Sequence, residues 1–145
     1  MPDPERCRPP MPTFIVLDRT GQPATAEAVG SMHAFGPDDL PVQSEITFER
    51  GVIGVKRAVP DSTGLCVQVE VPSPSGSGSL GRLTLQTALL PNRDEPYLLS
   101  LELARRQIML FLNKLEEWGL FDFGPAEMVL RQFEAARQRF TASLV

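Results

Sequence analysis

The middle of the chain alternates between apolar and polar side chains. In residues 65–71 every second side chain is apolar, which is typical of a strand with one buried face. Leu83 and Leu85 alternate with polar neighbours in the same way, and we expect this second strand to continue to Leu89. Residues 72–79, between the two strands, are rich in proline, serine and glycine. They are too small and polar to pack, so they predict a flexible connection.

Further strand signals lie nearer the N-terminus. Residues 46–57 predict a hairpin, because two apolar stretches flank a turn at Arg50-Gly51. An apolar run over residues 13–17, followed by turn-forming residues, predicts another strand. Glycines and prolines interrupt residues 22–43, where we expect a loop with at most a short helix. Because the strands follow one another without intervening helices, we expect them to pair antiparallel.

The last third of the chain changes to a helical period. From Tyr97 onward, apolar residues recur at steps of three and four, the pattern of an amphipathic helix. Residues 126–144 repeat this pattern after a Gly-Pro break and predict a second helix. Joined by a short turn, the two helices should form a hairpin that covers one face of the sheet. The expected stripe of the first helix consists of Leu98, Leu101, Ala104, Ile108, Leu112, Leu115 and Trp118.

These patterns predict an α+β fold within one domain. Its expected architecture is an antiparallel sheet or sandwich-like meander of about five strands, followed by a C-terminal helical hairpin. We assign the domain to residues 12–145, and a chain of 145 residues can bury a single core without cross-links. Residues 1–11 contain four prolines and four charged residues, so we expect them to form a disordered leader.

Charge and hydropathy exclude several classes of partner. The net charge is −4 and the arginines are scattered, whereas a nucleic-acid surface needs a basic stripe. No apolar run approaches the roughly 20 residues of a membrane span. The N-terminus has no apolar segment of the kind found in signal peptides, so we expect a cytoplasmic protein that binds neither nucleic acid nor membrane.

The residues that usually carry chemistry do not form a pattern. Cys7, Cys66 and the single histidine, His33, lack metal-ligand spacing, and we expect no metal or cofactor. No nucleophile-elbow sequence accompanies the histidine. Glu116 and Glu117 are neighbours on a helix and point in different directions, unlike the paired carboxylates of a glycosidase. We therefore expect a chain that is not an enzyme on its own.

One region resembles a known family. Residues 83–122, which include the segments 89–99 (LLPNRDEPYLL) and 114–122 (KLEEWGLFD), resemble the N-terminal region of glycoside hydrolase family 10, in endo-1,4-β-xylanase-like proteins of planctomycete bacteria. A weaker likeness extends over residues 44–140. In that family the catalytic barrel follows this region, and a barrel of about 250 residues cannot fit here. The family's catalytic glutamates therefore have no counterpart positions in this chain.

The resemblance implies a non-catalytic accessory domain in xylan degradation. Such a domain would bind a xylan-like polysaccharide or dock on a glycoside hydrolase barrel. The candidate ligand-binding residues are Arg93, Glu95, Tyr97 and Trp118, because a ring can stack on a sugar and charged groups can bond its hydroxyls.

The alternative is a protein–protein interaction or self-association module. Its C-terminal helices would provide the contact, including contacts between copies in a homo-oligomer. Exposed rings at Tyr97 and Trp118 would favour the sugar hypothesis. Burial of the same rings, with an apolar patch left on residues 125–144, would favour the interaction hypothesis.

Overall fold

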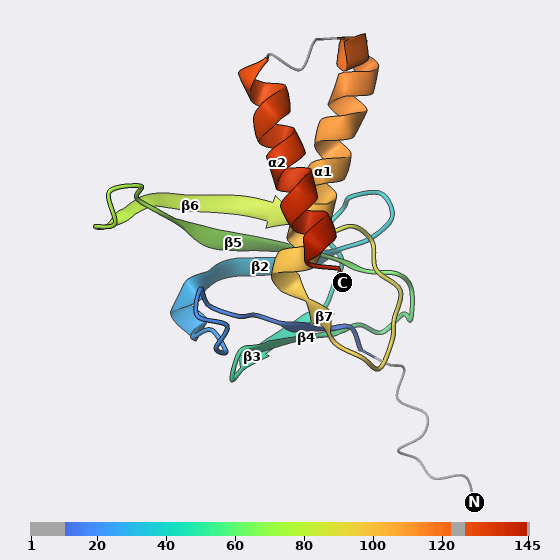
Figure 1. Ribbon diagram of the computed structural model, residues 1–145. Helices are drawn as coiled ribbons and strands as arrows, with labels where there is room; N and C mark the ends of the chain where they lie inside the picture. Colours follow the sequence, from blue (N-terminus) through green and yellow to red (C-terminus); the bar gives the residue numbers. More distant parts are fainter. Residues whose placement is uncertain (1–10, 123–126, 145) are drawn as a thin grey trace, which may run out of the picture.

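A computed structural model describes residues 11–122 and 127–144, and it contains two small sheets from which a helical hairpin projects (Figure 1). Of the predicted disordered leader, residues 1–10 lie outside the described part, as does Cys7. The described residues form seven strands, where about five were expected. The predicted α+β class, with mainly antiparallel strands and two C-terminal helices, is confirmed.

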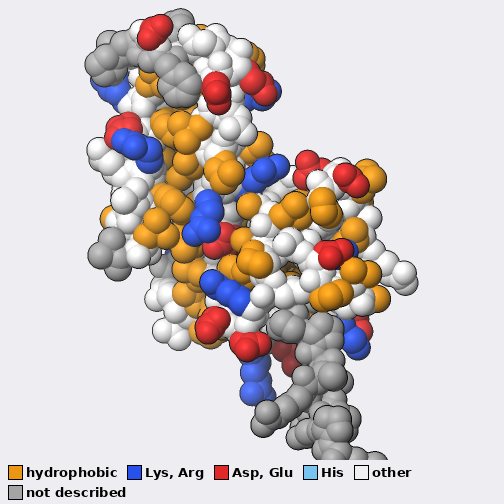
Figure 2. Space-filling model, turned by 90° about the vertical axis from the view of Figure 1, so that its right-hand side faces the viewer, with side chains coloured by type: hydrophobic (Ala, Val, Ile, Leu, Met, Phe, Trp, Pro, Cys, Tyr) orange, Lys and Arg blue, Asp and Glu red, His pale blue; other side chains and the backbone are white. Residues whose placement is uncertain are grey.

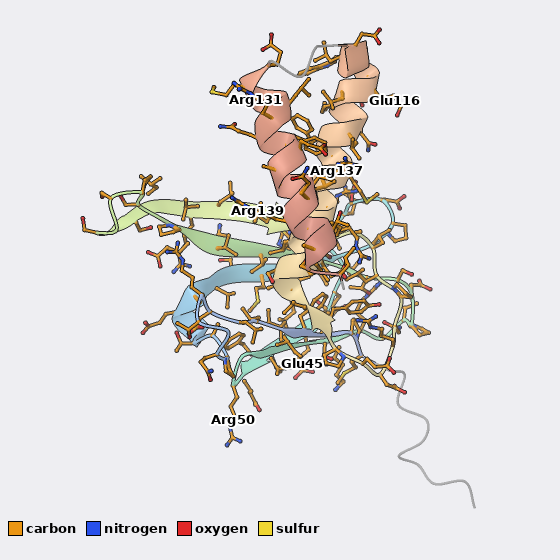
Figure 3. All side chains as sticks on the ribbon, in the orientation of Figure 1. Glu45, Arg50, Glu116, Arg131, Arg137 and Arg139 are labelled. Carbon is orange, nitrogen blue, oxygen red and sulfur yellow. The ribbon has the colours of Figure 1, made fainter. Side chains whose placement is uncertain are left out.

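The first sheet contains β3 (Glu45–Glu49), β4 (Val52–Lys56), β1 (Thr13–Ile15) and β7 (Tyr97–Leu98), in that spatial order. The predicted hairpin of β3 and β4 is confirmed, and Arg50 lies at its turn (Figure 3). Arg50 and Gly51 both have positive φ, of 48° and 77°, as tight two-residue hairpin turns require. β7 pairs with β1 in parallel, which antiparallel meander pairing did not predict.

The second sheet has the order β2 (Val29–Phe35), β5 (Gly64–Pro72) and β6 (Ser79–Gln86), and both of its pairings are antiparallel. The expectation of a loop over residues 22–43 is wrong, because this segment contains β2 after a short 3-10 helix, η2 (Ala26–Ala28). Gly30, a supposed strand breaker, leaves room for a neighbour: a Cβ there would meet Arg82 Nη1 at 2.1 Å. The segment is a strand because it pairs with β5, and the glycine does not interrupt that pairing.

The connection between β5 and β6 is shorter than expected. Pro72 and Ser79 are paired strand residues, so the turn is confined to residues 73–78. β6 also ends at Gln86, before Leu89. Leu90, which follows Leu89, is buried and forms an isolated antiparallel β-bridge with Thr63.

The two sheets share one hydrophobic core. Phe14, Ile53 and Val55 enter it from the first sheet, and Leu65 and Val67 from the second. All five are at most 1% exposed. The strands thus form two layers around common apolar side chains, which agrees with the sandwich-like arrangement expected.

Both predicted helices are present, as α1 (Leu99–Glu117) and α2 (Met128–Ala142), with a 3-10 turn, η3 (Leu120–Asp122), after α1. The expectation that they cover a face of the sheet is wrong. Only the first turns of α1 enter the core, through Leu99 and Leu103, and the rest of the hairpin stands away from the sheets (Figure 1). The core-facing side of α1 is therefore not the stripe expected from the sequence, and Leu112 of that stripe is exposed.

A turn stabilised by Asp18 follows β1. One carboxylate oxygen of Asp18 accepts hydrogen bonds from the N–H of Thr20 at 2.8 Å, the Thr20 hydroxyl at 2.7 Å and the N–H of Gln22 at 3.0 Å. The Thr20 hydroxyl, followed by the N–H groups of Gln22 and Thr20, lowers the pKa of Asp18 below its ordinary 3.8. Each bond favours the charged form.

We expect Asp18→Ala to destabilise the fold at pH 7 but not in acid. Because the folded-state pKa is depressed, the carboxylate stabilises the fold above pH 3.8 and loses that effect as the pH falls through the lower folded value. Urea unfolding of both proteins at pH 7 and well below pH 3.8 would measure this. Asp38→Ala, at another exposed aspartate, is the control; a deficit for Asp18→Ala that persists in acid would contradict the role of the charge.

Candidate functional site

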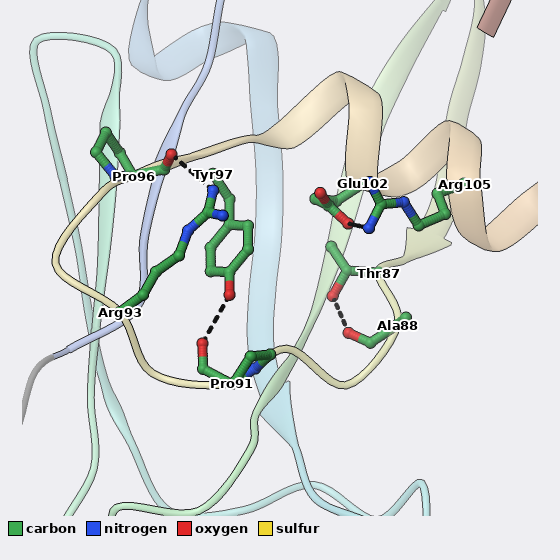
Figure 4. A network of polar contacts seen from close by, with 8 residues as sticks. All are labelled: Thr87, Ala88, Pro91, Arg93, Pro96, Tyr97, Glu102 and Arg105. Carbon is green, nitrogen blue, oxygen red and sulfur yellow. Dashed lines mark hydrogen bonds and ion pairs between the residues drawn. The ribbon is translucent and has the colours of Figure 1, made fainter. Parts of the chain in front are cut away.

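Arg93 and Tyr97 lie together just before α1, Arg93 in a loop and Tyr97 at the start of β7 (Figure 4), and Glu95 lies between them in the sequence. The Arg93 guanidinium lies over the Tyr97 ring, 3.6 Å from its centroid. Arg93 Nε donates to the Glu95 carbonyl at 2.9 Å and Nη2 to the Pro96 carbonyl at 3.1 Å. The Arg93 side chain therefore stabilises the conformation of the loop that contains it.

Tyr97 is part of this closed arrangement and is only 4% exposed. Its hydroxyl donates to the Pro91 carbonyl at 2.7 Å, and its ring lies 5.8 Å from that of Phe14, centroid to centroid. Burial raises the pKa of the Tyr97 phenol, and the nearby Arg93 charge opposes that rise. With Arg93 over its face and Phe14 beside it, the ring offers little surface for stacking on a sugar.

Trp118 lies apart from the other three predicted residues. It caps the C-terminal end of α1, and about 28 Å of helix separates it from Tyr97. Its side chain is 67% exposed, although the sequence pattern placed it at the end of a buried stripe. The four residues predicted to bind a ligand therefore do not form one site.

A buried carboxylate lies at the base of the hairpin. Glu102 is 4% exposed, and its Oε2 lies 3.6 Å from Nη1 of Arg105 (Figure 4). Nearby, the Thr87 hydroxyl donates to the Ala88 carbonyl and accepts the N–H of Leu65. The Glu102–Arg105 pair lies within α1, whereas the Thr87 hydroxyl joins the end of β6 to Leu65 in the core, so we assign these contacts a structural role.

The exposed apolar surface of the hairpin is the main feature outside the sheets. Residues 108–112 of α1 form an apolar run (IMLFL), and successive helical residues are about 100° apart, so the run surrounds the helix. α2 covers one side of it, where Phe111 stacks on Phe133 at 4.4 Å between ring centroids. Met109, Leu110 and Leu112 remain between 36% and 43% exposed. Figure 2 shows hydrophobic side chains in a band along the projecting hairpin.

An apolar groove continues this surface at the free end of the hairpin. Its volume is about 260 Å³. It is lined by Phe111, Lys114, Leu115, Trp118, Leu120, Glu127, Val129 and Leu130. Met128 and Val129 of α2 are also more than half exposed, and α2 has no buried residue among those described. We call the apolar run, this groove and Met128 the hairpin surface.

The sequence contained a signal for this surface, the apolar run over residues 108–112, but the search for apolar residues at steps of three and four overlooked it. Five consecutive apolar residues cannot all face one neighbour on a helix, so the run itself indicates a helix that needs cover on several sides. Assigning Ile108 and Leu112 to a single stripe left out Met109 and Leu110.

Groups suited to catalysis or metal binding are sparse in the described part of the chain. Cys66 is a free, buried thiol, and burial raises its pKa, which makes the reactive thiolate scarcer. His33 is exposed on β2. Within residues 11–122 and 127–144, no group of three or more His, Cys, Asp or Glu side chains is placed to hold a metal ion.

None of the helices in residues 11–122 and 127–144 is both long and apolar enough to cross a membrane.

Comparison with known proteins finds no matching family model, no matching curated protein and no matching solved structure. The resemblance of residues 83–122 to a xylanase-associated region therefore remains a hypothesis.

Proposed function

We propose that this chain is a non-catalytic interaction module that binds a protein partner through its hairpin surface. The observation that carries the proposal is the apolar run: α2 covers it at Phe111, and Met109, Leu110 and Leu112 remain 36–43% exposed. Fully burying a Leu or Met side chain is worth about 1.5–3 kcal/mol. A partner that covers Met109, Leu110 and Leu112 would gain part of that amount at each residue.

The shape of the hairpin supports the same proposal. A pair of antiparallel helices buries one face of each helix, whereas bundles of four bury the remaining apolar positions. α2 touches α1 through Phe133 but has no buried residue among those described. The hairpin thus resembles half of a helical bundle, and a helical partner would complete the bundle.

We test the proposal with a photo-cross-linking amino acid at Leu112. In the cell that makes the protein, irradiation should give one discrete adduct, identified by mass spectrometry. A variant that carries Met109→Glu as well as the probe at Leu112 should lose the adduct, because a charge in the covered surface opposes binding. The matched control places the probe at Leu40, another leucine, which is 65% exposed in the loop between β2 and β3. Equal labelling from both positions, or from neither, would refute the proposal.

Polysaccharide binding is a second candidate, and the exposed ring of Trp118 favours it. Stacking on a sugar needs an accessible ring face, which Trp118 has and Tyr97 lacks. If the chain is a xylanase accessory module, xylan gels should retard the wild type and not Trp118→Ala in affinity electrophoresis. If both proteins migrate through xylan, cellulose and mannan gels as fast as through a gel without polysaccharide, this candidate is excluded.

A further inference from the structure

Charges are unevenly distributed along the hairpin. Its free half, residues 112–122 and 127–132, carries four acidic and two basic residues: Glu116, Glu117, Asp122 and Glu127, with Lys114 and Arg131. The half nearer the sheets, residues 99–110 and 134–144, carries the reverse: Arg105, Arg106, Arg137 and Arg139, with Glu102 and Glu134. The net charges are therefore −2 at the free half and +2 at the other. Figure 3 shows Glu116 near the free end and Arg139 near the sheets.

The charges are arranged symmetrically about the apolar run. On α1, the pair Arg105-Arg106 and the pair Glu116-Glu117 are equally far in sequence from residue 111, about 8 Å along the helix on either side. Residue 111 lies within the apolar run, and Phe111 stacks on Phe133 of α2. An acidic end, an apolar middle and a basic end therefore follow one another along the hairpin.

We infer that the partner of the hairpin surface is a second copy of this chain, packed antiparallel. This inference rests on the proposed function. A two-fold axis across the hairpin at the level of Phe111 places the apolar run against itself. It also brings the acidic half of each copy level with the basic half of the other, so both charge contacts form at once. A parallel copy would instead place like charges together.

The product is a four-helix bundle made from two hairpins, with the sheets at opposite ends. Its centre contains Met109, Leu110 and Leu112 from both copies, which are the residues left exposed in one chain. The ion pairs Lys114–Glu117 and Arg137–Glu134 are exposed and span three residues of one helix. Such pairs contribute little, so they would not prevent these charges from facing a second copy.

The mass in solution tests the inference directly. Size-exclusion chromatography with light scattering should give twice the 16.0 kDa of one chain. Leu112→Glu should give a monomer, and Leu40→Glu should stay dimeric. Circular dichroism should show that both variants are folded.

Charge reversal tests the antiparallel arrangement. Glu116→Arg/Glu117→Arg makes the free half basic, and Arg137→Glu/Arg139→Glu makes the half near the sheets acidic. Arg105 and Arg106 are left unchanged, because Arg105 pairs with buried Glu102 and Arg106 is partly buried. Each variant alone should dimerise at least about tenfold more weakly, because like charges then meet across the two-fold axis. Mixed together, the two variants should form a heterodimer near wild-type strength.

Each other outcome refutes a defined part of the inference. A mixture that dimerises no better than its components would overturn the antiparallel arrangement. A monomeric wild type would overturn the second copy as partner. If the probe at Leu112 then cross-links to a different protein, the proposed function stands without this inference. If it cross-links to nothing, both fail.

Discussion

Replacing Phe14 with alanine should lower the free energy of unfolding by about 3–5 kcal/mol, the usual cost of removing a buried Phe side chain. Phe14 is 1% exposed, and its strand lies between β4 and β7 in the first sheet. Its ring lies beside Tyr97 and reaches the core shared by the two sheets. A cavity there would weaken both layers, so the loss should be a large part of the stability of a domain of this size.

Urea denaturation followed by circular dichroism measures this change. Val52→Ala is the matched control, because Val52 lies on the adjacent strand β4 but is 39% exposed. We expect its effect to be well below that of Phe14→Ala. Similar losses in the two variants would show that Phe14 is not in the core.

Gly64→Ala should also destabilise the fold strongly, although it adds a single methyl group. Gly64 pairs with Phe35 across β2 and β5, and the Phe35 ring lies over it. A Cβ at residue 64 would lie 2.0–2.5 Å from three ring carbons. Phe35 is itself only 1% exposed, so its ring cannot turn away into solvent without losing its burial, and we expect a loss at or above the about 1–3 kcal/mol typical of overpacking.

A double-mutant cycle separates this clash from a general effect on strand β5. Phe35→Leu removes the ring carbons that meet the new methyl group, so Gly64→Ala should cost much less in that background. If the two substitutions are additive, the ring does not restrict residue 64. A Gly64→Ala protein as stable as the wild type would contradict the close approach altogether.

Local sequence patterns determined most of the secondary structure. The turn at Arg50-Gly51 and the alternation over residues 65–71 each depend on neighbouring residues, which the chain lists in order. The helical periods before and after the Gly-Pro break likewise predicted both α1 and α2. Such features can be predicted from a turn residue or from the period of the apolar positions, even where, as in residues 65–71, the strand forms its hydrogen bonds with more distant segments.

Tertiary structure alone decided where these elements go. β2 is a strand because residues about 30 to 40 positions later pair with it, and β1 pairs in parallel with residues more than 80 positions away. Long-range pairing selected Leu99 and Leu103 as the core-facing side of α1 and left the apolar run beyond the sheets. Packing against Phe14 and Arg93 likewise buried Tyr97, whereas the separation of Trp118 from it follows from the length of α1. The sequence lists the apolar residues of a helix, but which of them is covered depends on which distant surface reaches it.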